Sequence, residues 1–187
     1  RVQPTLTHRF LAVLETRGKL DAVITQNIDG LHQKAGSKRV IEVHGSVRHG
    51  HCRSCGRAYA YEELKAKVLN QEIARCDSCS GIVKPDIVFF GEAVQGMAEA
   101  SRVAGQADLF FVIGSSLTVH PAASLPEYAG GQVVVVNQGP VEAASPEWLR
   151  IDEPADPFFA RIASKLSHAN ICQVYDVGPN YLVMDLI

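Results

Sequence analysis

Four of the five cysteines form two Cys-x-x-Cys pairs, a spacing typical of a metal site. Twenty residues separate the pairs, which lets four thiolates converge on one tetrahedral zinc ion. Four protein ligands leave no open position, so we predict a structural zinc rather than a catalytic one. Incidental buried or redox-active cysteines are the alternative. The predicted ligands are Cys52, Cys55, Cys76 and Cys79.

Two histidines and one further cysteine could affect this zinc prediction. His49 and His51 lie beside the first pair and could compete as ligands, but we expect them to be exposed. Cys172 has no Cys-x-x-Cys partner, and we expect it to be a small core residue.

Polar residues follow three short apolar runs, and their types suit a nucleotide-like ligand. The stretch ITQNIDGLHQKAG, residues 24–36, follows one run, GSSLTVHP follows Ile113, and NQGP follows Val136. Backbone N–H groups and hydroxyls after Ile113 could cradle a phosphate or ribose, and Asn137 offers an amide. Ordinary turn chemistry explains any one loop, but three together favour a ligand site.

The elements that must position these loops alternate between strands and helices. We expect strands at 22–25, 40–43, 87–90, 109–113 and 133–136 and helices near 4–18, 61–69, 96–106 and 121–129. This order predicts an α/β fold with a mostly parallel sheet and helices on both faces. The carboxyl ends of parallel strands meet at one edge, where ligands of such sheets bind.

Composition narrows the function classes. The chain has 187 residues, is 47% hydrophobic and has a formal net charge of −2. These values suit one or two domains with a core and give no basic field for nucleic acid or a membrane surface. The apolar runs are too short to span a bilayer. Free thiols are typical of reducing compartments, so we predict a cytoplasmic location.

The motifs and their order resemble the sirtuins, the NAD-dependent protein lysine deacylases. The resemblance covers roughly residues 1–140 and rests on TQNIDGLHQKAGS, EVHGS, the cysteine pairs, VKPDIVFFGE, GSSLTVHPAA and VVVVNQGP. It implies a Rossmann-type domain that binds NAD, residues 1–46 and 83–160, and a zinc-binding module, residues 47–82. It also implies an acyl-lysine protein or peptide as substrate, with no direct nucleic-acid partner and no membrane.

The resemblance implies a role for particular residues. His44, in EVHGS, matches the catalytic base, and a histidine suits that role because its ordinary pKa is near neutrality. The positions matching the NAD contacts are Gln26, Asn27, Ile28, Asp29, Gly114, Ser115, Ser116 and Asn137. The positions matching the substrate channel, where the peptide adds as a strand, are Val88, Phe90, Gly91, Glu92 and Val119.

Two segments depart from the sirtuin pattern. Residues 1–24 contain no glycine-rich pyrophosphate turn and no counterpart of the family's first central strand, so we expect an incomplete, weakly active or inactive form that binds NAD poorly. Residues 161–187 instead resemble a piece of a bacterial Ser/Thr protein kinase, on His168, Asn170, Ile171 and YLVMDLI. None of the kinase catalytic motifs is present, so we expect no kinase activity. A helix and hairpin of unrelated origin is the alternative.

The sequence thus supports two hypotheses from different classes, beside a third in which the chain is an unfolded fragment with only the zinc module ordered. The first is a partial NAD-dependent deacylase, most simply a deacetylase, with NAD as co-substrate and one structural Zn²⁺. The second is a non-catalytic zinc-bearing module that binds peptides. Release of nicotinamide from NAD separates the two, because the binding module predicts none.

Overall fold

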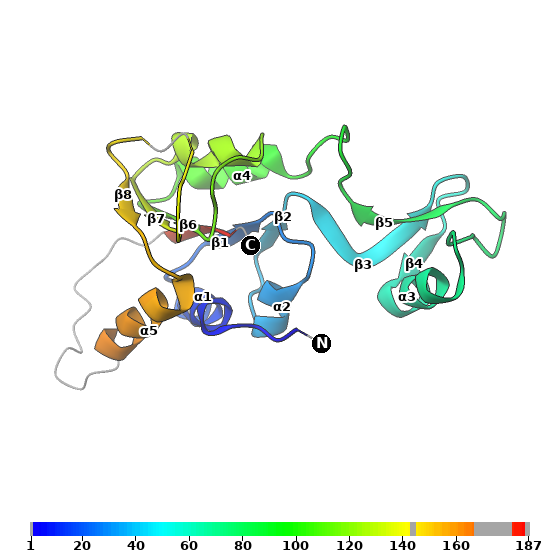
Figure 1. Cartoon of the computed structure of the whole chain (residues 1–187), viewed down its shortest axis with the longest axis horizontal. Coiled ribbons are helices and arrows are strands. Elements are labelled where there is room, and N and C mark those ends of the chain that lie inside the picture. The colour runs from blue at the N-terminus through cyan, green and yellow to red at the C-terminus, as the bar shows by residue number, and fades with distance from the viewer. Residues whose placement is uncertain (1, 143–144, 167–180, 186–187) are drawn as a thin grey trace.

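A computed structural model describes residues 2–142, 145–166 and 181–185 of the chain. They form a large α/β layer that carries a smaller lobe at one end (Figure 1). None of the described helices is long and apolar enough to cross a membrane.

The large sheet has six parallel strands in the order β2-β1-β9-β6-β7-β8. Their bounds are Val40–Glu42 (β2), Ala22–Thr25 (β1), Tyr181–Asp185 (β9), Leu109–Ile113 (β6), Gln132–Val136 (β7) and Leu149–Ile151 (β8). β1, β6 and β7 are the continuous apolar runs expected of strands covered on both faces, and the predicted parallel sheet is confirmed.

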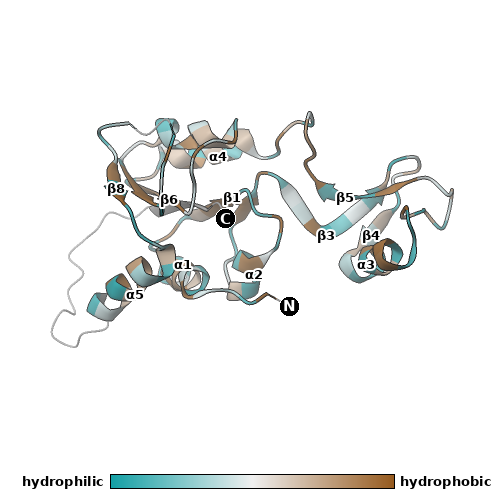
Figure 2. Ribbon diagram, viewed as in Figure 1, coloured by the Kyte–Doolittle hydropathy of each residue, from teal (hydrophilic) through white to brown (hydrophobic). Residues whose placement is uncertain are grey.

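Helices cover both faces of this sheet, and side chains of β1 alternate between them. Ala22 and Ile24 pack with α4 (Met97–Gly105) and the 3₁₀ helix η1 (Ala122–Tyr128). Val23 faces the other way, toward α1 (Leu6–Thr16) and α5 (Ala155–Leu166). Figure 1 shows α4 on one side of the sheet and α1 and α5 on the other, and Figure 2 shows the hydrophobic colouring along β1. One core therefore lies on each side of the strands.

Strand β9 corrects the expectation for the end of the chain. It lies between β1 and β6, parallel to both, with Val183 in register with Val23 and Phe111. The expected free hairpin is therefore wrong for residues 181–185, because two neighbouring ladders pair their backbone groups. The predicted boundary between residues 160 and 161 lies inside α5. His168, Asn170 and Ile171, which carry the kinase resemblance, lie outside the described residues.

The smaller lobe is a three-stranded antiparallel sheet in the order β4-β3-β5, covered by one helix. Its elements are β3 (Gly45–Cys52), β4 (Ala58–Ala60), α3 (Tyr61–Asn70) and β5 (Val83–Ile87). This sheet extends a few residues beyond the predicted module on both sides. The expected strand at 87–90 is wrong in position, because β5 pairs with β3 and ends at Ile87.

Helix α5 is fixed to α1 by one carboxylate and a group of aromatic rings. Asp156 accepts hydrogen bonds from the backbone N–H of Thr7, at 3.0 Å, and from its hydroxyl, at 2.5 Å. Phe159 packs against the rings of Phe10 and Phe111 at centroid distances of 5.4 and 5.8 Å. A carboxylate at the first turn of α1 also interacts favourably with the helix dipole.

Replacing Asp156 with alanine is expected to lower the free energy of unfolding by about 2 kcal/mol, because a charged cap is lost. Partial burial raises the pKa of this carboxyl, but hydrogen bonds from Thr7, Thr5 and Leu6 outweigh it, so the net shift is downward. A lowered carboxyl pKa stabilises the fold above the unfolded value, about 3.9, and this contribution is lost as the pH falls through the folded value.

Urea titrations at pH 7 and at pH 3 measure this effect. The gap between the wild type and Asp156→Ala should narrow at the lower pH. Asp108→Ala, in the exposed turn before β6, is the matched control and should change stability little at either pH. An Asp156→Ala variant as stable as the control at pH 7 would show that the cap contributes nothing.

Candidate functional site

The four predicted zinc ligands are brought together by two turns of the same design. In each turn the residue two positions after the first cysteine donates its N–H to that sulfur, at 3.4 Å from Ser54 to Cys52 and from Ser78 to Cys76. The residue four positions after the first cysteine of each pair has a positive φ, which is 74° at Gly56 and 59° at Ser80. The first turn uses the glycine that this backbone favours, whereas the second holds a serine there.

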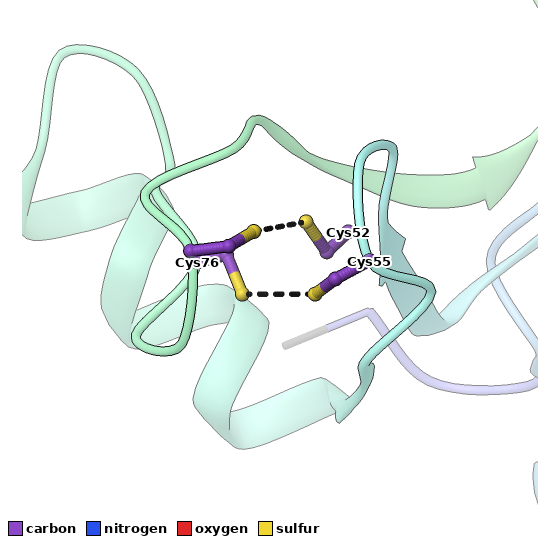
Figure 3. Close-up of side chains that lie close together, drawn as sticks. Cys52, Cys55 and Cys76 are labelled. Carbon is purple, nitrogen blue, oxygen red and sulfur yellow. Dashed lines mark hydrogen bonds between the residues drawn. The ribbon is translucent and has the colours of Figure 1, made fainter.

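The spacing of the sulfur atoms fits a tetrahedral zinc ion. The Sγ atoms of Cys52 and Cys79 lie 3.5 Å apart and those of Cys55 and Cys76 lie 3.6 Å apart. All four ligand atoms lie within 4.8 Å of one another, and Figure 3 shows Cys52, Cys55 and Cys76 converging. Zn–S bonds of about 2.3 Å place tetrahedral sulfurs about 3.8 Å apart, whereas a disulfide requires about 2.05 Å.

Hydrogen bonds favour thiolate at two of the four cysteines. At Cys79 the N–H of Gly81 lowers the pKa, but the sulfurs of Cys52 and Cys55 outweigh it and raise the pKa to about 12. The Tyr59 hydroxyl contributes most to holding the pKa of Cys76 at about 6, with help from backbone N–H groups of the same turn. The pKa of Cys52 is also lowered, chiefly by the N–H of Cys55. Because thiolate is the form that binds metal, these donors prepare the site for a cation.

The predicted nucleotide residues lie together at the carboxyl edge of the large sheet. Gln26 to Asp29 follow β1, Gly114 to Ser116 follow β6, and Asn137 follows β7. These strands are parallel within one sheet, so the three loops share one edge. The backbone N–H of Gly114 donates to the carbonyl of Val136 at 2.9 Å, which ties two of the loops together.

Several of these side chains bond to their own loops. Asp29 accepts the N–H of Leu31 at 2.8 Å and so opens the short helix α2 (Leu31–Ala35), which the sequence did not predict. Ser115 is buried and accepts the N–H of Leu117 at 3.0 Å. Both groups therefore shape the edge, and Asp29 keeps a second carboxylate oxygen as a further acceptor.

Gln26 has a buried side-chain amide at this edge that could bind a ligand. It is only 6% exposed, and neither its Nε2 nor its Oε1 has a hydrogen-bond partner among the described residues. A buried amide without partners is costly, so an amide-bearing or hydroxyl-bearing ligand would find a donor and an acceptor already desolvated here. The residues thus fit the nicotinamide and ribose of NAD.

His44 stands between this edge and the smaller lobe with its tautomer fixed. Its Nδ1 lies 3.1 Å from the carbonyl oxygen of Gln26, which can only accept, so Nδ1 carries the proton. Nε2 of the neutral ring is then an available base. The next residue, Gly45, has a φ of 76°, and a Cβ there would lie 2.0 Å from the carbonyl oxygen of Asp86. Glycine is therefore required where the chain turns from His44 into β3.

Of the predicted substrate residues, Val88 contacts His44 directly. The N–H of Val88 donates to the carbonyl of His44 at 2.9 Å, and Phe90 is fully exposed. Glu92 accepts from Lys84 at 2.7 Å, so its carboxylate holds the 88–92 turn rather than facing a substrate freely. Val88 and Glu92 also line a cavity of about 520 Å³ beside β5. Val119 is half exposed on the loop after β6.

Comparison with known proteins now places the chain in a family. The model of the Sir2 family matches residues 1–121. The chain belongs to the Sir2 family. A sirtuin of Thermotoga maritima, an NAD-dependent protein deacetylase, is 45% identical over 144 residues, 74% of this chain and 58% of the relative. An NAD-dependent protein deacetylase of Sulfolobus acidocaldarius is 50% identical over 139 residues, which cover 72% of this chain and 55% of the relative.

Solved sirtuin structures share the fold. A Sir2 complex with a p53 peptide and NAD⁺ superposes with a TM-score of 0.83 at 40% identity, covering 88% of this chain and 70% of that one. Sir2Tm bound to a propionylated peptide gives 0.83 and 40%, covering 88% and 71%. The predicted Rossmann-type fold with a cysteine-bearing lobe is confirmed. The chain spans just over half the length of the curated sirtuins it matches.

Proposed function

We propose that this chain serves NAD-dependent removal of acyl groups, acetyl first among them, from lysine side chains of proteins. NAD as co-substrate accepts the acyl group on its ADP-ribose part and loses nicotinamide. The observation that carries the proposal is His44, whose Nδ1–H is bound to the backbone carbonyl of Gln26, so that Nε2 is left to accept a proton. The side-chain amide of the same Gln26 is buried with no hydrogen-bond partner among the described residues.

The proposed division of labour follows from positions. Gln26, Asn27, Ile28 and Asp29 would hold the nicotinamide and its ribose, and Gly114, Ser115, Ser116 and Asn137 would hold the adenosine side. The backbone and apolar side chains of Val88, Phe90, Gly91 and Val119 would line the acyl-lysine stem and pair with the peptide as an added strand. His44 would take a proton from a ribose hydroxyl.

The two-part organisation is proposed on the same basis. Residues 1–46 and 83–160 would form the nucleotide-binding domain, and residues 47–82 the zinc module. Two separate sheets support this division, since β3, β4 and β5 pair only with one another among the described strands. The assignment of a cytoplasmic location rests on the four free thiols of the module.

The His44→Ala variant tests the catalytic role. A positioned general base contributes about 10²–10⁴-fold, so in a chain with a sirtuin N-terminal segment fused before Arg1 we expect deacylation of an acetyl-lysine peptide to fall by that range while peptide binding persists. Mass spectrometry of the peptide measures the rate, and fluorescence anisotropy measures binding. His49→Ala, an exposed histidine on β3, is the matched control and should retain the wild-type rate.

Nicotinamide release separates the proposal from the alternative binding module. Residues 1–187 lack a glycine-rich pyrophosphate turn in the first 24, so NAD saturation is expected only at high concentration. If a chain with a sirtuin N-terminal segment fused before Arg1 binds the acetylated peptide but releases no nicotinamide at saturating NAD, the binding module is the better account. Equal rates for His44→Ala and the wild type would remove His44 from the mechanism.

A further inference from the structure

Tyr59, on the short strand β4, lies in the core of the smaller lobe beside the cysteine cluster. It is 1% exposed and packs with Leu64, Ala74 and Val83. A buried tyrosine hydroxyl needs hydrogen-bond partners. Because the ring is packed in the core, the hydroxyl cannot reach water and must bond to protein groups. The position of the hydroxyl is therefore set by the core of the lobe.

Both partners of this hydroxyl belong to the second cysteine turn. It donates to Sγ of Cys76 at 3.2 Å and accepts the N–H of Asp77 at 3.0 Å. A backbone N–H can only donate, so the hydroxyl proton is directed to the sulfur.

Charged groups surround the ring and hold the same turn. The guanidinium of Arg57 and the ammonium of Lys67 lie 5.3 and 5.2 Å from the ring centroid. Lys67 also binds the carboxylate of Asp77 at 2.6 Å. Tyr59 is thus fixed on its faces and at its hydroxyl, and the second cysteine turn is fixed with it.

Four thiolates around one Zn²⁺ carry a net charge of −2, which donors to sulfur reduce. Cys76 receives two such donors, the Tyr59 hydroxyl and the N–H of Ser78. Groups that orient metal ligands by hydrogen bonds typically change metal affinity by about 10–100-fold when they are removed. The hydroxyl also fixes the direction of the Cys76 sulfur, since its own position is not adjustable.

We propose that Tyr59 is a positioning residue of the metal site, which holds the Cys76 thiolate for the ion through its hydroxyl and thereby sets how tightly the lobe retains zinc. The proposal rests on the four-cysteine zinc site and goes beyond the proposed deacylation. Under this proposal a residue of the apolar core of the lobe contacts a metal ligand directly.

The Tyr59→Phe variant of the full chain removes one oxygen and keeps the ring. We expect zinc affinity, measured by competition with a chromogenic chelator, to fall by about 10–100-fold. After Co²⁺ substitution, the thiolate-to-cobalt charge-transfer band should shift, because one sulfur loses a donor. Tyr61→Phe, half exposed at the start of α3, is the matched control and should match the wild type in both readouts.

A measurement on the wild type keeps the proposal testable if the variant fails to fold. In the chain loaded with ¹¹³Cd, the Tyr59 hydroxyl proton should exchange slowly with water and show coupling to the metal through sulfur. Absence of this signal, or wild-type affinity and an unshifted band in Tyr59→Phe, would overturn the proposal. A wild-type chain that binds neither zinc nor cobalt would overturn the metal site itself, and Tyr59's role with it.

Discussion

Replacing Cys55 with serine is expected to release zinc and unfold the lobe from β3 to β5. Structural zinc in small modules contributes about 10 kcal/mol or more to folding, far more than the small core of this lobe can replace. Cys55 is exposed, so the substitution disturbs packing little and tests the ligand role itself. The zinc content, measured by elemental analysis, should fall from one ion per chain toward zero. The backbone amides of β3 and β5 should lose protection against hydrogen exchange.

The large sheet provides the internal reference for this experiment. Its cores contain no residue of the cysteine cluster, so protection in β1 and β6 should persist. Cys172→Ala, at the cysteine outside both pairs and outside the described residues, should keep one zinc per chain. Undiminished zinc in Cys55→Ser would contradict the four-cysteine site.

Replacing Val183 with proline is expected to abolish cooperative unfolding of the large sheet. Proline has no N–H to donate, so it removes a hydrogen bond of the ladder and is confined to edge strands and bulges in natural sheets. Val183 is paired on both sides, with Val23 and Phe111, so losing β9 would leave two further strands with unpaired edges. The free energy of unfolding should therefore fall by more than it would if β9 were paired with one strand alone.

Thermal melting followed by circular dichroism measures this loss, and amide exchange in β1 and β6 locates it. Val2→Pro, at an exposed position before α1, is the control and should melt like the wild type. The lobe should still bind zinc in Val183→Pro, since β9 takes no part in its sheet. A wild-type melting curve for Val183→Pro would mean that residues 181–185 are dispensable for the large sheet.

The strands that are continuous apolar runs could be predicted from the sequence. The runs at 22–25, 109–113 and 133–136 became β1, β6 and β7 because continuous apolar residues favour strands buried on both faces. The predicted helix at 121–129 is instead the 3₁₀ helix η1, which contains Pro126 and therefore lacks one backbone donor. The cysteine spacing predicted a cluster that the structure brings within bonding distance of one ion.

What the sequence could not provide depends on contacts between distant residues. YLVMDLI has the same apolar pattern whether it forms a hairpin or a central strand, and only its pairing with β1 and β6 decides between them. The link between His44 and Gln26 joins residues 18 positions apart through one carbonyl, which no side-chain pattern reveals. The cap that Asp156 forms on α1 spans 149 positions.

The place of β9 also determines when the sheet can form during synthesis. The strand lies at the centre of the sheet but emerges from the ribosome after all five of its companions, 68 residues behind the end of β6. At about 5–20 residues per second, β6 waits roughly 3–14 s with its inner edge unpaired, and β1 waits longer. Open edges of apolar strands readily pair with other chains. The nascent protein therefore passes through an interval in which the edges of β1 and β6 are open to pairing with other chains.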